Sequence, residues 1–410
     1  MTKSPLFTPV LIAASFILIL NFGIRASFGV FQLPIANEFG WVRADFSMAI
    51  AIQNLAWGVG QPIFGAISER FGDRRAIIAG AFLYALGLVL SSFAVTPGQH
   101  QLLEILVGFG IAGTGFGMIL AIVGRAASPE NRSLALGITT GLGSAGQVFG
   151  PLAAQALLRH YPWQTVFLIF AALILCVLFA LPFLRAPSKA KSEPEESLTT
   201  VLKRAFRDPS YTLIFLGFFS CGYQLGFITA HFPAFIAEMC SPIMPGSFLA
   251  GLGITSTSVL GAIAIALIGV ANIGGSILAG WLGKKYPKKY LLAGVYTLRT
   301  IASILFISLP MTPATVVIYS LVMGSLWLAT VPLTSGLVAQ IYGLRYMGTL
   351  YGFVFFSHQV GAFLGVWLGG RLYDVTGNYT AVWWVGIGVG ALSAILHLPI
   401  RERALTAQPA

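Results

Sequence analysis

The chain has 410 residues, of which 57% are hydrophobic and only 9% charged, and its mean hydropathy is +0.84. A water-soluble protein of this length would carry far more charge on its surface, so the composition indicates a polytopic membrane protein. The formal net charge of +11 could in another protein indicate nucleic-acid binding. The three cysteines, Cys176, Cys221 and Cys240, are dispersed in or near apolar runs, and they predict neither a disulfide framework nor a metal site.

A helix needs about 20 apolar residues to cross the hydrocarbon core of a bilayer, and the sequence contains twelve such runs. The first follows Met1–Val10 without the short apolar core and small-residue cleavage site of a signal peptide, so we expect it to remain as a membrane helix. The runs lie at roughly 9–36, 43–67, 76–95, 99–125, 133–158 and 163–185, and then at roughly 209–237, 255–283, 289–309, 312–340, 348–372 and 379–400.

The stretch between the sixth and seventh runs, residues 186–208, is rich in Lys, Glu, Ser and Pro. Such a segment cannot bury enough apolar surface to fold into the bilayer and is typical of a solvated linker. We therefore predict a six-helix bundle at 1–185, a cytoplasmic linker at 186–208, and a second six-helix bundle with a short cytoplasmic tail at 209–410. The expected class is an all-α polytopic membrane protein.

The basic residues are distributed unequally between the two sides of the membrane. If the N-terminus is placed in the cytoplasm, 19 of the 24 lysines and arginines fall on the cytoplasmic side. Arg43, Arg159 and Arg371 fall outside, and Arg25 and Arg299 fall within apolar runs. This asymmetry predicts a multi-pass protein of the inner membrane with both termini in the cytoplasm. It also explains the positive charge through the anionic leaflet of the lipid bilayer, and no nucleic-acid partner is expected.

The second apolar run ends in a glycine-rich turn, Gly65-Ala-Ile-Ser-Glu-Arg-Phe-Gly-Asp-Arg-Arg75. Five charged side chains lie between Glu69 and Arg75, so this turn must lie at a membrane surface. A weaker copy, 280–289, begins 215 residues after Gly65 and again separates two apolar runs. The spacing is about half of the chain and indicates two halves with the same plan.

The first turn resembles the signature loop between the second and third membrane helices of the major facilitator superfamily. Glu69 stands where Asp is usual, and in the second copy Lys284 replaces the acid and Pro287 the second glycine. The resemblance implies twelve transmembrane helices in two pseudo-symmetric six-helix bundles. It also implies a conformational latch that stabilises one conformer, with a charge relay of Glu69, Asp73 and Arg74. The predicted latch residues are Gly65, Glu69, Arg70, Gly72, Asp73, Arg74 and Arg132.

Small residues recur in the fifth and eleventh runs, for example Gly137 and Gly141 in the fifth and Gly361 and Gly365 in the eleventh. A four-residue spacing of small residues lets helix backbones approach closely. Two interpretations remain open: sliding contacts between the halves, or ordinary tight packing.

No enzyme chemistry is predicted. The sequence contains no metal-ligand spacing, no P-loop and no constellation of acid and base groups. The stretch 108–113 fits Gly-x-Gly-x-x-Gly, but it lies within an apolar run with no preceding strand, so the context of a dinucleotide site is absent. We expect no catalytic residue, no metal and no cofactor.

Arg25 is a charged residue well inside the first apolar run. It lies about 24 Å along a helix that begins at Pro9, at about 1.5 Å per residue, which is too deep to reach the cytoplasm readily. An ionised side chain at this depth is costly unless it faces a wet cavity or a partner. We interpret Arg25 as a cavity-facing guanidinium whose planar fork binds an anion. The alternative is an internal ion pair or a structural arginine capped by carbonyls, and Asn21 is included in the same predicted site.

Other polar residues at membrane depth are candidates for the substrate pathway, and each has a packing alternative. Arg299, in the ninth run, is the second buried cation. His358 is the candidate proton-sensitive group, since an unperturbed histidine titrates near neutral pH. Glu104, in the outer part of the fourth run, is interpreted as interfacial rather than as a proton carrier. The remaining candidates are Tyr223, Gln224, Trp327, Gln53 and Asn54.

Two short stretches indicate a narrower family. The stretch 132–137, Arg-Ser-Leu-Ala-Leu-Gly, resembles the Arg-x-Leu-Ala-x-Gly signature that opens the fifth helix of monocarboxylate transporters. Arg25 looks like the point on their first helix where a lysine implicated in proton and substrate coupling occurs. The run 255–283 lacks the Asp/Arg pair that the eighth helix of that family usually supplies for the carboxylate. The resemblance therefore implies that Arg25, alone or with Arg299, binds the carboxylate here.

Three functions follow as hypotheses, in this order. The first is a secondary active transporter of small organic anions of the monocarboxylate kind, working by alternating access with proton symport or with exchange against a counter-anion. The second is a proton-coupled exporter of drugs or metabolites with the same fold, which an acid at mid-membrane in the first or fourth helix would favour. The third is a non-transporting membrane receptor or sensor, which an appended soluble domain or a degraded signature turn would favour.

Overall fold

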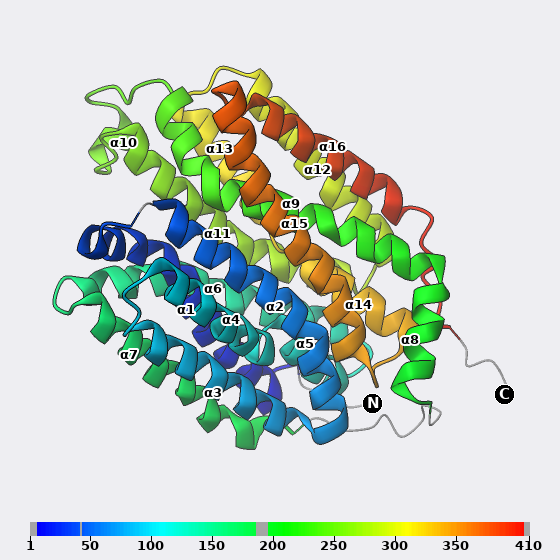
Figure 1. The fold of residues 1–410 in the computed structure, drawn as a ribbon. Helices are drawn as coiled ribbons and strands as arrows, with labels where there is room; N and C mark the ends of the chain where they lie inside the picture. The colour runs from blue at the N-terminus through cyan, green and yellow to red at the C-terminus, as the bar shows by residue number, and fades with distance from the viewer. Residues whose placement is uncertain (1–5, 42, 186–195, 406–410) are drawn as a thin grey trace.

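The computed structural model describes residues 6–41, 43–185 and 196–405, and Figure 1 shows how they are arranged. Within these ranges the regular elements are helices, and no strand is found. The elements are α1 (Pro9–Phe39), α2 (Arg43–Phe71), α3 (Asp73–Ser91), α4 (Pro97–Thr114), α5 (Phe116–Ala126), α6 (Arg132–Leu158), α7 (Trp163–Leu175), the 3₁₀ helix η1 (Cys176–Phe183), α8 (Leu198–Arg207), α9 (Pro209–Met239), α10 (Phe248–Gly251), α11 (Thr257–Leu282), α12 (Lys288–Ser308), α13 (Pro313–Leu326), α14 (Thr330–Tyr342), α15 (Met347–Thr376) and α16 (Thr380–His397).

Ten spans, some made of two consecutive helices, are long and apolar enough to cross a membrane. Two further long helices, α2 and α6, are more polar, and their polar residues include Gln53, Gln61, Thr139 and Ser144, all of them buried in protein. A helix whose polar groups face protein need not be as hydrophobic as one that faces lipid. With α2 and α6, the described chain has the twelve helical spans that the apolar runs predict.

The fourth span breaks at Gly115, between α4 and α5. A Cβ atom at this position would lie 2.6 Å from the carbonyl oxygen of Ile111, so the break requires a residue without a side chain. The amide nitrogen of Asn21 in α1 donates to this same carbonyl and to the hydroxyl of Thr114. A buried side chain therefore supplies hydrogen bonds that the interrupted helix lacks.

The tenth span breaks at the corresponding place in the second half, between α13 and α14. The side-chain oxygen of Asn272 accepts from the N–H of Leu328 (2.9 Å), and Nη2 of Arg299 donates to the carbonyl oxygen of Trp327 (2.9 Å). Both broken spans are thus held by polar side chains from neighbouring helices. Irregular backbone is tolerated at membrane depth only where such partners exist.

The two halves meet along two pairs of helices, α2 with α15 and α6 with α11 (Figure 1). A Cβ atom at Gly65 would lie 2.4 Å from the carbonyl carbon of Gly348, and one at Gly280 would lie 2.7 Å from the Cα of Gly137. Other glycines of the predicted stripes pack within their own half, as Gly146 does against α1. The small-residue stripes therefore serve both contacts between the halves and packing within a half.

The turns 65–75 and 280–289 lie at one end of the bundle, which we call the basic end; we call the other end, where α1 meets α2, the opposite end. The N–H of Leu405 donates to the carbonyl oxygen of Ile341 near the end of α14, so the last described residues also lie at the basic end. The predicted linker, 186–208, lies partly outside the described residues. Its described part contains α8, and the carbonyl oxygen of Glu196 just before this helix accepts from the Tyr346 hydroxyl (2.8 Å).

Candidate functional site

Arg25 contacts two residues of α2 that lie one turn apart, Asn54 and Trp57. Its Nη2 donates to Oδ1 of Asn54 (2.7 Å), and its guanidinium carbon lies 4.8 Å from the centre of the Trp57 ring. We call these three residues the Arg25 group. A charge-assisted hydrogen bond and a cation–π contact fix the position of the guanidinium.

The Arg25 side chain is half-buried and keeps unused hydrogen-bond donors. Its Nε is buried and has no hydrogen-bond partner among the described atoms. Nor does any ion pair of Arg25 occur in the described part of the chain. A carboxylate at the Nε edge would receive charge-assisted hydrogen bonds in surroundings of low dielectric constant.

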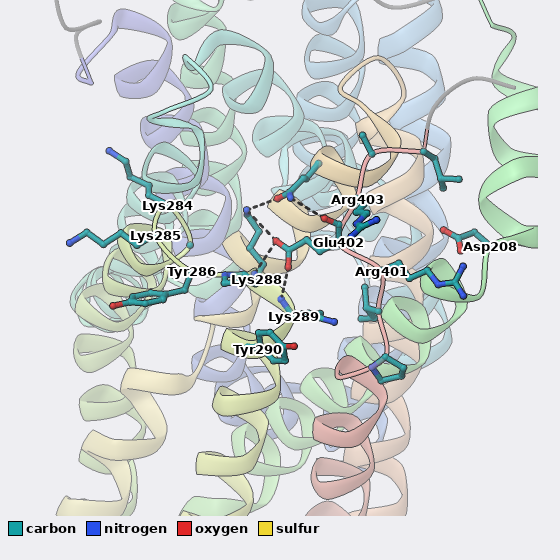
Figure 2. A pocket seen from close by; sticks show the side chains of 17 residues that line it. Asp208, Lys284, Lys285, Tyr286, Lys288, Lys289, Tyr290, Arg401, Glu402 and Arg403 are labelled. Carbon is teal, nitrogen blue, oxygen red and sulfur yellow. Dashed lines mark hydrogen bonds and ion pairs between the residues drawn. The ribbon is translucent and has the colours of Figure 1, made fainter. Parts of the chain in front are cut away.

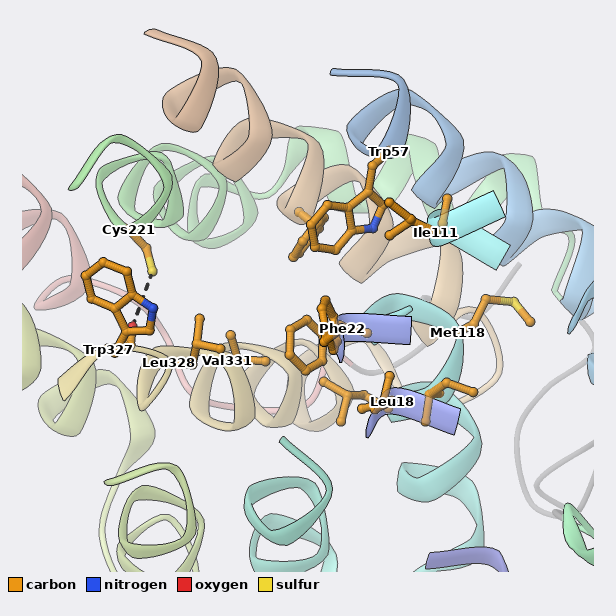
Figure 3. Close-up of a cluster of buried hydrophobic side chains, with 14 of the residues drawn as sticks. Leu18, Phe22, Trp57, Ile111, Met118, Cys221, Trp327, Leu328 and Val331 are labelled. Atoms are coloured by element: carbon orange, nitrogen blue, oxygen red, sulfur yellow. Dashed lines mark hydrogen bonds between the residues drawn. The ribbon is translucent and has the colours of Figure 1, made fainter. Parts of the chain in front are cut away.

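A series of aromatic contacts joins the Arg25 group to the second half. The Trp57 ring lies 4.7 Å from that of Phe355, which in turn stacks on His358 at 5.1 Å. Figure 3 shows Trp57 and Phe22 of the first half in the same buried cluster as Val331 of the second. Arg25 and His358 therefore lie at the two ends of one series of contacts that crosses the interface between the halves.

His358 is buried, and its hydrogen bonding is incomplete. Its Nδ1 lies 3.2 Å from Oε1 of Gln359, whereas its Nε2 has no hydrogen-bond partner among the described atoms. An imidazole with one free nitrogen can make one further hydrogen bond or take up a proton. Nε2 is therefore available for one further hydrogen bond, and the role of His358 as a substrate contact or proton-sensitive group stays a prediction.

Among the described contacts, no hydrogen bond joins the other predicted substrate residues to the Arg25 group. Nε2 of Gln224 donates to the carbonyl oxygen of Gly386 in α16 (3.1 Å), within its own half. Tyr223 lies close to the same Gly386, and its hydroxyl is buried without a hydrogen-bond partner among the described atoms. The remaining three, Asn21, Arg299 and Trp327, take part in the two helix breaks.

One polar contact between the halves is not predicted from the sequence. Asn272 of α11 donates to the hydroxyl of Ser144 in α6 (2.9 Å), and the same amide holds the break in the tenth span. Both side chains are fully buried. A lone asparagine in the apolar run 255–283 is the signal that could have identified this contact, because buried amides are almost always hydrogen-bonded.

The predicted latch residues lie at the basic end. Asp73 accepts two hydrogen bonds from Nη2 of Arg125, at 2.6 and 2.7 Å, in an ion pair that the sequence does not predict. Glu69 accepts from the N–H of Thr349 at the start of α15 (2.9 Å) and from its hydroxyl. Glu69 therefore connects the two halves, while Asp73 stabilises the first half.

The rest of the latch set is more loosely placed. Nε of Arg132 donates to the carbonyl oxygen of Gly124 (2.9 Å), and Arg70 and Arg74 are exposed. Gly72, with φ of 97°, adopts a conformation that favours glycine, and it makes the sharp turn into α3 possible.

The interpretation of Glu104 as interfacial is wrong. Its side chain is fully buried in the first half, where Oε2 accepts from Nε2 of Gln53 (2.6 Å). The position of Glu104 in the sequence indicates its depth in the membrane but not the direction of its side chain. The side chain faces α2 rather than lipid or water.

In the described residues no group of three or more His, Cys, Asp or Glu side chains is placed to hold a metal ion.

Residues 11–366 match the family model described as Major Facilitator Superfamily. Monocarboxylate transporter 13 of Bos taurus is 30% identical over 403 residues, which cover 95% of this chain and 89% of that protein. An uncharacterized MFS-type transporter of Bacillus subtilis, YcxA, is 25% identical over 393 residues, which cover 91% of this chain and 90% of that protein.

Among solved structures, the transporter FucP in its outward conformation has a TM-score of 0.72 with 15% sequence identity. The similarity covers 94% of this chain and 97% of that one. At this identity the likeness concerns the fold alone. It confirms the predicted all-α fold with twelve transmembrane helices.

Proposed function

The chain belongs to the Major Facilitator Superfamily, whose members are transporters and not enzymes, and we propose that it carries small organic anions of the monocarboxylate kind. Two observations support this substrate class. The first is the cation at mid-membrane with unused donors, and the second is the 30% identity with monocarboxylate transporter 13. Family membership favours a transporter over a receptor or sensor.

The observation that carries the proposal is the half-buried Arg25 next to the interface between the halves. Its two partners, Asn54 and Trp57, are both neutral, so they do not neutralise the positive charge of the guanidinium. A monocarboxylate bound there would cancel this charge in a place where an uncompensated charge is costly. His358, at the far end of the aromatic contacts, is the proposed contact from the second half.

The conformer agrees with alternating access about this site. At the basic end the halves are held together by Glu69 with Thr349 and by Nζ of Lys284 with Oδ1 of Asn131 (3.0 Å). We propose that the basic end faces the cytoplasm of a cell with an inner membrane, and that this conformer is closed on that side. Both termini are then cytoplasmic, and the bundles 1–185 and 209–410, joined by the linker 186–208, are the bodies that move. The partner in transport is a proton or a counter-anion.

The proposal is tested by uptake of labelled lactate, pyruvate, formate and oxalate into proteoliposomes, with and without an inward proton gradient. Arg25→Ala should abolish uptake, because no other cation lies in the Arg25 group. Arg25→Lys should retain transport with a raised KM, since a lysine keeps the charge and loses the planar fork. Arg159→Ala, which removes an exposed arginine at the opposite end, should leave uptake unchanged. Uptake of none of these acids by the folded wild type would contradict the substrate class.

A second candidate function keeps support from one observation. Glu104 is a buried acid on the fourth span, and such an acid suits a proton-coupled exporter of drugs or metabolites. The direction of coupling distinguishes the two functions. If the protein is an exporter that is inserted inside-out in vesicles, an outward proton gradient should drive accumulation of a cationic dye in the lumen. If the protein is an anion symporter, the gradient should leave the dye unaffected.

A further inference from the structure

Glu104 and His100 form a buried pair of titratable groups that the proposed anion site does not use. Both lie on α4, one turn apart, and the exposed fractions of their side chains are 0% and 2%. A carboxylate in such a place loses its hydration and needs either a cation or a proton. Oε2 of Glu104 accepts one hydrogen bond from Gln53, whereas its Oε1 has none among the described atoms.

The group that faces Oε1 is the imidazole of His100, whose Nε2 lies 3.7 Å away and also lacks a hydrogen bond among the described atoms. Among the described residues no lysine or arginine forms an ion pair with Glu104. The two groups can hold one proton between them, as neutral acid with neutral imidazole or as carboxylate with imidazolium. Loss of that proton would leave an uncompensated negative charge in the protein interior.

Residues of α2, α3 and α7, together with Trp41, surround the pair. His100 contacts the rings of Trp41, which precedes α2, Phe46 of α2 and Phe167 of α7. The polar neighbours are Gln53 of α2 and Tyr84 of α3, and the Tyr84 hydroxyl lies within electrostatic range of both Glu104 and Arg25. His100 lies one turn nearer to the opposite end than Glu104, so it stands between the carboxyl and that side of the membrane.

The pair is linked to the anion site through two consecutive residues. Gln53 donates to Glu104, and Asn54 accepts from Arg25, so a shift of this segment of α2 changes both hydrogen bonds. Charge also favours joint binding, because an anion at Arg25 compensates a buried positive charge and a proton at Glu104 compensates a buried negative charge. The two sites are therefore placed for coupling.

We propose that the Glu104–His100 pair is the binding site of the proton that is transported together with the organic anion. The proton enters from the opposite end, is held between Nε2 of His100 and Oε1 of Glu104, and leaves to water on the other side when the halves change conformation. Only bonds to the proton form and break in this cycle. One monovalent anion and one proton cross the membrane together, so no net charge is moved. This step rests on the anion transport proposed above.

Difference infrared spectroscopy of the purified protein tests the proton site without any substrate. A component of the carbonyl stretching band of protonated carboxyls should disappear as the pH is raised in the wild type, and this component should be missing from the spectra of Glu104→Gln. Glu38→Gln removes an exposed acid at the opposite end, whose carboxylate accepts hydrogen bonds from Trp163 and Gln164. This control variant should keep the pH-dependent change. Identical spectra for wild type and Glu104→Gln would overturn the proposal. His100→Gln should shift the pH at which the band disappears, and an unshifted band would exclude His100 from the pair.

Transport in two modes then tests the coupling. In Glu104→Gln, accumulation of a labelled carboxylate driven by an inward proton gradient should fall far more than counterflow exchange of the same acid without a gradient. Equal loss in both modes, or no loss, would contradict a role in proton coupling. If the wild type moves no carboxylate in either mode, the anion proposal fails, and the infrared result alone decides whether the pair holds a proton.

Discussion

The two glycine-rich turns at the basic end make similar connections with different residues. In the first turn Asp73 begins α3 and pairs with Arg125 of α5. The residue 215 positions after Asp73 is Lys288, at the start of α12, so the second turn lacks this acid. Figure 2 shows what replaces it: the carboxylate of Glu402, from the C-terminal tail, accepts from the N–H groups of Lys288 (3.0 Å) and Lys289 (3.1 Å).

The partners of the two turns correspond as well. Gln340 stands 215 residues after Arg125, and its Oε1 accepts from Nζ of Lys288 (2.8 Å), where Arg125 binds Asp73 in the first half. A negative charge at the N-terminus of a helix is favourable because the first N–H groups have no partner within the helix. The second half therefore retains an acid at this helix start although its own turn has lost it.

The backbones of the two turns differ where a glycine has been replaced. Gly72 precedes α3 with φ of 97°, whereas Pro287, 215 residues later, precedes α12 with φ of −58°. Proline cannot adopt a positive φ, so the chain enters the two helices by different routes. The two halves therefore share an acid at the start of this helix, although different parts of the chain supply it.

The largest effect is expected when the first turn loses its acid. Asp73→Ala removes the partner of Arg125, whose side chain is 7% exposed, and breaking such a largely buried ion pair costs up to about 3–5 kcal/mol. The midpoint of thermal unfolding of the purified protein should fall strongly. Asp73→Asn combined with Arg125→Gln should be less destabilising than Asp73→Ala alone, since no unpaired charge remains. A double variant that is worse than the single one would contradict the importance of the ion pair.

A smaller effect is expected at the glycines that bring the halves together. In Gly65→Ala the new Cβ meets the backbone of Gly348. Overpacking of this kind should destabilise the conformer with the closed basic end by about 1–3 kcal/mol. Transport should slow by roughly fivefold or more, because about 1.4 kcal/mol corresponds to tenfold in a population. Gly294→Ala, at a helical glycine with open space around it, is the matched control and should leave the rate unchanged. Equal rates for the two variants would show that close approach at Gly65 is not required.

The fold could be predicted largely from the sequence, whereas the helix breaks could not. The predicted runs 9–36 and 209–237 coincide closely with α1 and α9, because the length of an apolar run directly reports a membrane crossing. The breaks after α4 and α13 interrupt continuous apolar runs. The breaks depend on Asn21 and Asn272 from other helices, so the local sequence does not predict them.

The site was only partly predictable, for the same reason. Arg25 could be identified because a charge in an apolar run is costly wherever it points. Arg125 was missed because its partner Asp73 lies 52 residues away in the sequence. Glu104 was misjudged because depth in the membrane does not tell whether a side chain faces lipid or protein.

The acid that the tail supplies should contribute less than the acid of the first turn. Glu402→Gln keeps one oxygen for the N–H groups of Lys288 and Lys289 but loses the charge, and loss of a helix cap costs about 0.5–2 kcal/mol. Thermal unfolding should show a moderate decrease in the midpoint, smaller than that of Asp73→Ala. Glu130→Gln, at an exposed acid of the same end, should show none. A Glu402 effect as large as that of Asp73 would mean that the two helix starts are equally dependent on their acids.

The smallest effect is expected at the residue of the second turn that crosses to the first half. Lys284 is exposed and makes one hydrogen bond, to the side chain of Asn131, whereas Glu69 is bonded to both the N–H and the hydroxyl of Thr349. Exposed charges contribute little, so Lys284→Ala should change the transport rate by less than about twofold. Glu69→Ala should slow transport clearly more, because it removes two hydrogen bonds between the halves at a half-buried position. If Lys284→Ala slows transport as much as Glu69→Ala, the second turn is a latch in its own right, and the asymmetry between the two turns lies in their residues and not in their function.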